Sequence, residues 1–317
     1  MPLISANSLK KAFVIDARFG GRTPLQAVDG VSFTLSRGET LGLVGESGCG
    51  KTTLGRLLLR LLEPDSGSVL YEGTEITRKN IRRYRSRMQI IFQNPEGCLD
   101  PRMRIHDIVA EGIKLNQKDV SKNGRREQVS ELLNSVGLRP EDALLYPHEL
   151  SGGQRQRIGV ARALAVDPEF IVCDEPVSSL DVSYQSQIIN LLEDMQKTRG
   201  LSYLFISHDL SVVRHISDRI GVMYLGRLVE IGLVDEIILH PAHPYTKSLL
   251  AAIPVPDPRA VRTKVSGEET EFYREDRNNT TGCNYYRSCR FAKTICGDAR
   301  PVAAEIAPGH LCACHLY

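Results

Sequence analysis

The sequence predicts an α/β fold with a helical insert and a small cysteine-rich tail, and three observations support this prediction. Between residues 31 and 92, short apolar runs typical of strands alternate with one amphipathic helix. Helical periodicity then replaces the strand signal from about residue 93 to residue 165. Beyond it, two apolar runs at 169–175 and 202–208 have the composition of buried parallel strands.

Each element is placed by its pattern of apolar residues. Strands are short apolar runs, and helices have apolar residues three or four positions apart. In chain order we expect strands at 31–35 and 39–45, a helix at 51–63, strands at 68–73 and 88–93, helices at 127–136, 154–165 and about 183–197, and a segment at 218–232 that closes the core.

Composition limits the possible functions. The 317 residues carry 40 Lys and Arg against 38 Asp and Glu, a net charge of +2, so bulk charge gives no reason to expect nucleic acid as a partner. The N-terminal residues lack the apolar core of a secretory signal. The most leucine-rich stretch, Leu57 to Leu62, is interrupted by Arg60, whereas a membrane-spanning helix needs about 20 apolar residues. Any membrane role is therefore expected to depend on partner proteins.

The chain is expected to divide near residue 240. Five prolines between residues 241 and 258 and a polar stretch at 267–281 indicate a linker. We predict one domain at 1–240, with the helical subdomain at about 94–165, and a tail region at 241–317. Five of the eight cysteines lie between Cys283 and Cys314. In a chain without an export signal, such a cluster more often binds metal than forms disulfides.

A phosphate-binding loop is indicated at residues 45–52, GESGCGKT, which fit G-x-x-x-x-G-K-[ST] between a predicted strand and a predicted helix. Its glycines let backbone N–H groups surround phosphate oxygens at a helix N-terminus. Lys51 is predicted to bridge the β- and γ-phosphates, and Thr52 to offer its hydroxyl to Mg²⁺. The loop residues predicted to contact the nucleotide are Gly45, Ser47, Gly48, Cys49, Gly50, Lys51, Thr52 and Thr53.

Two carboxylates follow the buried strand FIVCD. We predict that Asp174 holds Mg²⁺ and that Glu175 orients or deprotonates the attacking water. Two acids in this place could instead cap the next helix, but the phosphate loop earlier in the chain favours the catalytic interpretation.

A second phosphate-binding arrangement, LSGGQ at residues 150–154, opens the predicted helix that precedes these acids. At this spacing the chain resembles the ABC ATPase family over residues 3 to about 240, which implies a P-loop NTPase (RecA-like) core. The resemblance implies a head-to-tail dimer. In it, Ser151, Gly152, Gly153 and Gln154 of one subunit close on the nucleotide bound to the other subunit's phosphate loop.

The same resemblance assigns four more positions. Gln93 matches the glutamine that contacts Mg²⁺ and the attacking water, and His208 matches the histidine that contacts the γ-phosphate. Asp181 belongs to the D-loop Ser179-Leu-Asp181, where the family more often has Ala at the first position. Phe13 lies where the family places the aromatic that stacks on adenine, although a Phe near a first strand is often a core residue.

The tail resembles the C-terminal region of ATPases from dipeptide and oligopeptide importers, on the residues HPYTKSLLAAIPVPDP (243–258), Gly282-Cys283 and CHL (314–316). The resemblance implies that Cys283, Cys289, Cys296 and Cys314 bind a [4Fe-4S] cluster. Their spacing, C-x5-C-x6-C-x17-C, fits no common zinc finger. Four thiolates could still hold Zn²⁺ or remain free, and Cys312 is an alternative fourth ligand. NYYRSC departs from the family, which commonly has Pro-Arg before the second cysteine.

GESGCGK and DEPVSSLDVS resemble the F-type subunit of these importers. This implies an ATP-hydrolysing motor at the cytoplasmic face of the membrane, paired with a D-type ATPase and docked on two permeases. A substrate-binding protein delivers the cargo to these permeases. Nickel or glutathione importers share this subunit type and remain alternatives, because the permeases and the binding protein choose the cargo. A non-transport ABC ATPase is disfavoured by the absence of a long coiled-coil insert between Gln93 and Ser151.

Overall fold

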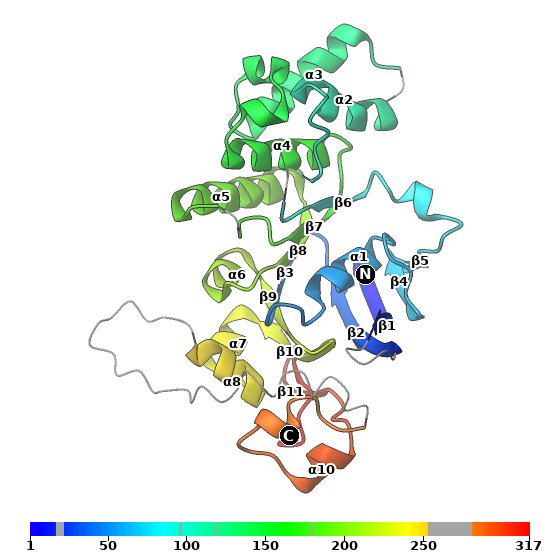
Figure 1. Ribbon diagram of the computed structural model, residues 1–317, viewed down its shortest axis with the longest axis vertical. Coiled ribbons are helices and arrows are strands. Elements are labelled where there is room, and N and C mark those ends of the chain that lie inside the picture. The colour runs from blue at the N-terminus through cyan, green and yellow to red at the C-terminus, as the bar shows by residue number, and fades with distance from the viewer. Residues whose placement is uncertain (17–21, 95–96, 118, 179, 253–280) are drawn as a thin grey trace, which may run out of the picture. The chain divides into compact units, whose positions relative to one another are not determined.

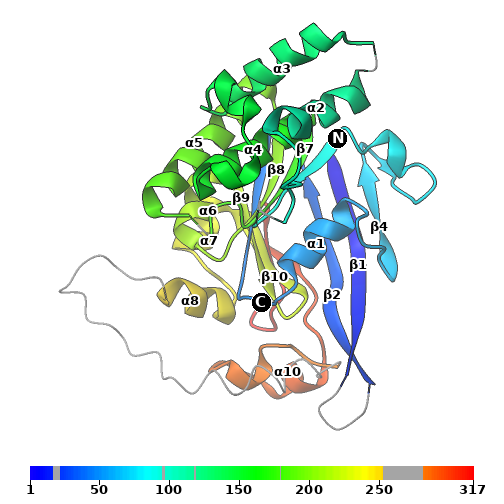
Figure 2. The same ribbon diagram turned by 45° about the horizontal axis from the view of Figure 1, so that its top comes forward.

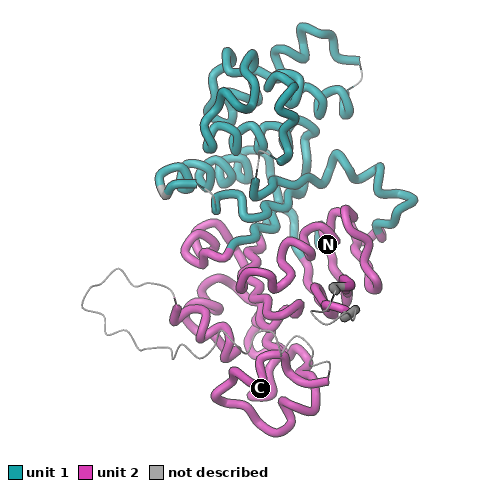
Figure 3. Tube along the Cα trace, viewed as in Figure 1, with its two compact units in different colours: residues 1–3, 35–40, 76–207 teal, residues 4–34, 41–75, 208–317 magenta. Residues whose placement is uncertain are grey.

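The computed structural model describes residues 1–16, 22–94, 97–117, 119–178, 180–252 and 281–317. The chain forms two compact units, coloured separately in Figure 3. Unit 1 comprises residues 1–3, 35–40 and 76–207, and unit 2 comprises residues 4–34, 41–75 and 208–317. Because both units are built from separated stretches, each depends on pairing between distant parts of the sequence. None of the helices in the described ranges combines the length and hydropathy that crossing a membrane requires.

Unit 1 contains three parallel strands in the order β8-β7-β6. Every residue of β7 and β8 is buried, as the apolar sequences FIVCD and SYLFI predict. Register pairs Met88 with Phe170, and Phe170 with Ser202. The elements of this unit are η1 (Ile81–Arg83), β6 (Met88–Ile91), α2 (Ile105–Asn116), α3 (Lys122–Ser135), η2 (Pro140–Leu144), η3 (Pro147–Glu149), α4 (Gly152–Leu164), β7 (Phe170–Asp174), α5 (Val182–Arg199) and β8 (Ser202–Ile206).

The predicted helical insert is present as α2, α3 and α4, which lie together in Figure 1. It begins as helix at Ile105 rather than near residue 93. Its core consists of fully buried aliphatic side chains from all three helices, which at about 25 cal/mol per Å² are the main stabilising term. They include Ile105, Val109, Val129, Leu133, Ile158, Val160 and Ala161.

Unit 2 contains a four-stranded antiparallel sheet, β2-β1-β4-β5. The expected strands at 31–35 and 68–73 correspond to the end of β2 and to β4, whereas the sequence pattern does not predict β1 or β5. The long strands of this sheet run side by side in Figure 2, with Ile4 opposite Tyr71 in the β1–β4 pair. The elements of unit 2 are β1 (Ile4–Asp16), β2 (Arg22–Leu35), β3 (Thr40–Val44), α1 (Lys51–Leu58), β4 (Ser66–Tyr71), β5 (Thr74–Glu75), α6 (Leu210–Ile216), β9 (Arg219–Tyr224), β10 (Arg227–Leu233), α7 (Val234–Leu239), α8 (Pro244–Ala251), η4 (Tyr286–Ser288), α10 (Thr294–Asp298), β11 (Ala304–Ala307) and β12 (His310–Cys312).

A second set of strands in unit 2 runs β11-β12-β10-β9-β3. Strand β3 is parallel to β9, which forms a hairpin with β10 through Leu225 and Gly226, both at positive φ. Strand β12 pairs with β10, placing Cys312 opposite Glu230. The C-terminal strands therefore extend the same sheet as β3. The predicted linker falls largely on residues 253–280, which lie outside the described residues.

Asp29 on β2 joins the tail to the rest of unit 2 by ion pairs. Its carboxylate lies 2.7 Å from Arg227 of β10, 3.1 Å from Arg300 of the tail and 3.8 Å from Lys10. Burial by itself raises the pKa of Asp29, but the hydrogen bond and charge of Arg227, with Arg300 and Lys10, outweigh it and lower the pKa below its usual value.

Replacing Asp29 with Asn should lower the free energy of unfolding by about 1–3 kcal/mol at pH 7, because two guanidinium groups lose their charged partner. A carboxylate whose pKa is lower in the folded than in the unfolded state stabilises the protein at pH values above its unfolded-state pKa. This stabilisation is lost as the pH falls through its folded-state pKa. The difference between wild type and variant should thus shrink below about pH 4.

Chemical denaturation at a series of pH values measures this. The control is Asp65→Asn, which removes an exposed carboxylate 2.7 Å from Lys11 and should cost less than about 1 kcal/mol. Equal losses for the two variants would contradict a special role of Asp29.

Candidate functional site

The predicted phosphate loop connects β3 to α1, and its glycines are required by close packing. Gly45 has φ +147°, and a Cβ there would lie 2.1 Å from the backbone oxygen of Met223. Gly50 has φ +109°, and a Cβ there would lie 2.0 Å from the backbone oxygen of Ala27. Neither position has room for a side chain. The loop is thus fixed between β9 and β2.

Lys51 opens α1 with its ammonium group turned into this loop. The side chain is buried, and Nζ donates to the Gly45 oxygen at 2.7 Å and to the Glu46 oxygen at 2.9 Å. Ser47 and Gly48, in contrast, are exposed at the rim. Burial raises the pKa of the Cys49 thiol, an effect that the Lys51 charge partly offsets. The loop therefore encloses the Lys51 ammonium group, with the Cys49 thiol beside it.

Glu175 and Gln93 meet within unit 1. Gln93 Nε2 donates to Glu175 Oε2 at 3.0 Å and to Ser178 Oγ at 3.2 Å. Glu175 has φ +48°, a conformation that costs a non-glycine residue roughly 1–3 kcal/mol and that clusters at functional sites. Its N–H donates to the Ile206 oxygen at 3.0 Å, which holds this turn at the end of β7. Asp174, the last residue of β7, is buried.

The LSGGQ segment forms the N-terminus of α4 with a capping box. Ser151 Oγ accepts the Gln154 N–H at 3.3 Å, and Gln154 Oε1 accepts the Ser151 N–H at 2.9 Å. A Cβ on Gly153 would lie 2.8 Å from the ring of Tyr184, an exposed side chain that would have to shift. A Cβ on Gly152 would meet, among the described residues, only Leu180 at 4.0 Å. The chain's own described packing thus gives no reason for glycine at 152.

The remaining predicted positions divide between the units. Phe13 lies on β1 with 37% of its surface exposed, so it is not a core residue, and the Lys11 ammonium lies 5.9 Å from its ring centre. His208 is exposed just before α6 in unit 2, and Asp181 is exposed at the start of α5 in unit 1. Ser179 lies outside the described residues.

The four predicted ligand cysteines line one cavity in unit 2. Cys283, Cys289, Cys296 and Cys314 share it with aromatic and aliphatic side chains such as Phe291 and Leu316. The cavity volume is about 10 Å³, enough for about one water. Burial, together with the other three cysteines, raises the pKa of Cys283 to about 11. Within the described ranges, no three His, Cys, Asp or Glu side chains converge closely enough to hold a single metal ion.

Cys312 is separated from these four. It lies within β12 opposite Glu230, is fully buried and does not line the cysteine cavity. Burial, with the nearby Glu230 charge, raises its pKa far above the usual range. Its place outside the cavity is what distinguishes Cys312 from the other four cysteines of the tail.

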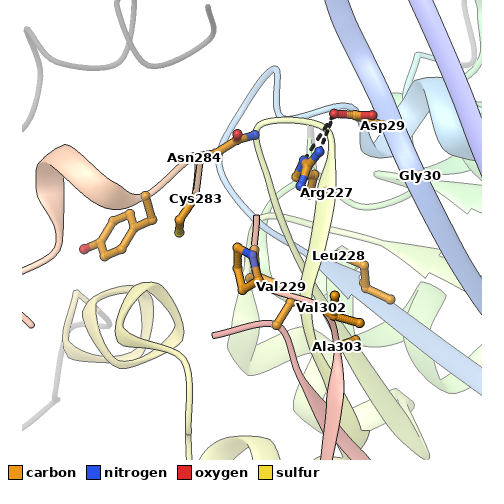
Figure 4. A pocket seen from close by; sticks show the side chains of 12 residues that line it. Asp29, Gly30, Arg227, Leu228, Val229, Cys283, Asn284, Val302 and Ala303 are labelled. Atoms are coloured by element: carbon orange, nitrogen blue, oxygen red, sulfur yellow. Dashed lines mark hydrogen bonds and ion pairs between the residues drawn. The ribbon is translucent and has the colours of Figure 1, made fainter. Parts of the chain in front are cut away.

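A second cavity of unit 2, about 230 Å³ in volume, borders the segment that follows Cys283 (Figure 4). Asn284 Nδ2 donates to the Leu225 oxygen at 3.0 Å at the β9–β10 turn, and Asp29 and Arg227 line the same cavity. Sequence reasoning did not identify Asp29, Asn284 or the buried Glu230. For Glu230 the available signal was a charged residue between apolar neighbours in RLVEIGL.

Comparison with known proteins now adds to this geometry. Residues 28–178 match the family model for the ABC transporter, and residues 229–296 match that for the oligopeptide/dipeptide transporter C-terminal region. The chain is 54% identical to the oligopeptide transport ATP-binding protein OppF of Bacillus subtilis (strain 168), over 83% of this chain and 86% of that protein. It is 48% identical to the putative oligopeptide transport ATP-binding protein YkfD of the same organism, over 100% of this chain and 96% of that protein.

The chain belongs to the ATP-binding subunits of oligopeptide and dipeptide ABC transporters. Solved ABC cassettes agree. CbiO1 from Clostridium perfringens superposes with a TM-score of 0.64 at 28% identity, covering 75% of this chain and 91% of that one. The ATP-binding cassette MJ0796 bound to ADP and Pi superposes with a TM-score of 0.66 at 25% identity, covering 73% of this chain and 98% of that one.

Membership in this family confirms the predicted α/β P-loop core and the predicted ATPase activity of an ABC subunit. The resemblance to F-type subunits agrees with relatives named OppF and AppF. ATP is the nucleotide that this family binds, typically with Mg²⁺. The roles of individual residues stay predictions.

Replacing Glu175 with Gln should leave ATP binding intact but lower turnover by about 10²- to 10⁴-fold, because the amide keeps the shape but cannot accept a proton. Nucleotide binding by the purified chain and steady-state hydrolysis by the chain assembled with its expected partner ATPase and permeases measure this. The control Ser178→Ala removes the other Gln93 partner and should lower turnover by less than about tenfold. A Glu175→Gln enzyme as active as this control would exclude Glu175 as the base.

Proposed function

We propose that the chain is the motor that powers import of oligopeptides through two partner permeases. The observation that carries this is the combination in one chain of an ABC core with the C-terminal region of oligopeptide and dipeptide transporters. Its relatives over nearly the whole length are named for oligopeptide transport or peptide import. The permeases hold the chain at the cytoplasmic face of the membrane, and a substrate-binding protein delivers the peptide to them.

In this proposal, residues 45–53 bind the ATP phosphates and Phe13 stacks on adenine. Gly45 and Gly50 support the loop assignment, because their positions leave no room for a Cβ. Mg²⁺, when bound, neutralises phosphate charge, and the Thr52 hydroxyl and the Asp174 carboxylate are oxygen donors of the type it prefers. Glu175 takes a proton from the attacking water, and the hydrogen bond from Gln93 holds the Glu175 carboxylate in place. His208 contacts the γ-phosphate.

A second subunit completes the site. The main support for this second subunit is Gly152, because among the described residues a Cβ there would contact Leu180 alone, at 4.0 Å. Glycine at that position suits close approach of another molecule's phosphate. We propose that Ser151, Gly152, Gly153, Gln154 and Asp181 act on nucleotide bound by a D-type ATPase partner, and that the partner's equivalent residues act on nucleotide bound here.

The tail, residues 241–317, is proposed as a separate functional region in which Cys283, Cys289, Cys296 and Cys314 hold a [4Fe-4S] cluster. Support comes from the shared cavity of the four thiols and from their mutual charge effect, which a cation would relieve. The thiols do not converge on a single point within the described residues, and the cavity has only about 10 Å³, so binding either metal requires them to move. Four thiolates can hold Zn²⁺ tetrahedrally. Zinc therefore remains the alternative.

The metal can be identified in protein purified without oxygen. We expect iron and acid-labile sulfide with broad visible absorbance, and their loss in Cys314→Ser. Cys312→Ser is the matched control and should keep the metal, because Cys312 lies outside the cavity. Stoichiometric zinc in colourless protein would show that the four cysteines bind Zn²⁺ and not an iron–sulfur cluster. Metal that survives Cys314→Ser but not Cys312→Ser would overturn the ligand assignment.

The transport assignment is tested by what the chain binds in its host. Affinity-tagged Glu175→Gln protein, extracted gently from membranes in the presence of Mg-ATP, should bring down two permeases and a different ABC ATPase, because slow hydrolysis prolongs the closed complex. Wild-type protein without nucleotide is the control and should retain less of the second ATPase. Recovery of a homodimer alone, or of nucleic acid, would contradict the proposal.

A further inference from the structure

A tyrosine of the C-terminal region contacts the phosphate loop directly. Tyr245 lies in the first turn of α8 and is 2% exposed. Its hydroxyl oxygen accepts the Glu46 N–H at 3.1 Å. Glu46 is the second residue of the predicted phosphate loop, 199 positions earlier in the chain, and both residues belong to unit 2.

This contact acts on the peptide plane that also holds Lys51. The Glu46 N–H and the Gly45 carbonyl belong to one peptide unit, which is planar. The Tyr245 hydroxyl accepts a hydrogen bond from the N–H of this peptide unit, and the Lys51 ammonium donates one to its carbonyl oxygen at 2.7 Å. Rotation of that plane would disturb both bonds at once. The tyrosine hydroxyl therefore helps to set the position of the lysine that is proposed to meet the phosphates.

Tyr245 is itself held rigidly. Its ring centre lies 4.5 Å from that of Tyr224 and 5.6 Å from that of Tyr285, separations at which aromatic rings attract. Its N–H donates to His243 Nδ1 at 3.0 Å. Because the ring and the backbone are both fixed, the hydroxyl oxygen has a defined position.

The buried carboxylate of Glu230 anchors the start of α8. It accepts the Ala242 N–H at 2.7 Å and the His243 N–H at 2.9 Å, and it pairs with His310 Nε2 of β12 at 2.7 Å. Glu230 is 1% exposed. The segment that carries Tyr245 is thus tied to β10 and to the last strand of the tail.

A second connection reaches the loop from the residues after Cys283. Asn284 Nδ2 donates to the Leu225 oxygen at 3.0 Å, and the next residue, Gly226, donates its N–H to the Cys49 oxygen at 2.8 Å. Tyr285 lines the cysteine cavity and packs on Tyr245. The tail therefore supports both halves of the phosphate loop.

We propose that Tyr245 is a positioning residue of the ATP site, which orients the Gly45–Glu46 peptide and, through it, Lys51. This inference rests on the proposed role of residues 45–53 in binding phosphate. Tyr245→Phe keeps the packed ring and removes the hydroxyl acceptor. It should raise the Kd for ATP and the KM by about three- to tenfold, the effect of one hydrogen bond, with a smaller change in kcat.

The experiment compares full-length wild type, Tyr245→Phe and Tyr203→Phe by ATP titration and thermal unfolding of the purified chain, and by steady-state hydrolysis of the chain assembled with its partner ATPase and permeases. Tyr203→Phe is the matched control, since it also removes a buried tyrosine hydroxyl, one that donates to the Leu192 oxygen at 3.0 Å. We expect both variants to show similar Tm values and only Tyr245→Phe to bind ATP more weakly. Unchanged ATP affinity in Tyr245→Phe, or an equal loss in Tyr203→Phe, would overturn the proposal.

Lys51→Ala separates this inference from the site assignment. If Lys51→Ala abolishes ATP binding while Tyr245→Phe has no effect, the phosphate site stands and the positioning role fails. If Lys51→Ala binds ATP normally, the assignment of the loop fails, and the role of Tyr245 fails with it.

Discussion

The phosphate loop is held by backbone contacts on several sides, and the arrangement of unit 2 depends on this packing. The Met223 and Ala27 oxygens lie where side chains at 45 and 50 would be. The Cys49 oxygen accepts the Gly226 N–H, and the Gly45 and Glu46 oxygens hold the Lys51 ammonium. Groups held in fixed positions need little reorganisation when they meet a charged ligand. Electrostatic stabilisation by such preorganised groups is usually the largest single contribution to catalysis.

The C-terminal region belongs to this support and is not merely appended to the core. Strand β12 pairs with β10, Glu230 joins β12 to the start of α8, and Asp29 joins β2 to Arg300. A change in the cysteine cavity would therefore act on residues one or two contacts from the phosphate loop. This gives a physical reason why a tail characteristic of oligopeptide and dipeptide transporters accompanies the ATPase in one chain.

Much of the fold, and the place of the loop at 45–50 between a strand and a helix, could be predicted because the signals are local. Strands β7 and β8 are apolar throughout, and the phosphate loop is a contiguous motif. Strand β1 was missed because ISANSLKKAFVID lacks regular alternation, and its pairing with β4 joins residues about 60 positions apart. The Glu46–Tyr245 bond could not be predicted, since a backbone N–H carries no residue-specific signal. The Gln93–Glu175 contact likewise joins positions 82 apart.

The most direct test of the account is ATP hydrolysis by the chain assembled with its permeases and second ATPase in liposomes. If the chain is the motor of a peptide importer, hydrolysis rises when the substrate-binding protein carries an oligopeptide. The peptide then moves from the side of the binding protein into the compartment that contains the ATPases, and it does so only while ATP is hydrolysed. Hydrolysis that ignores the peptide-loaded binding protein, with no ATP-dependent peptide movement, would contradict the proposal that this ATPase is the motor of a peptide importer.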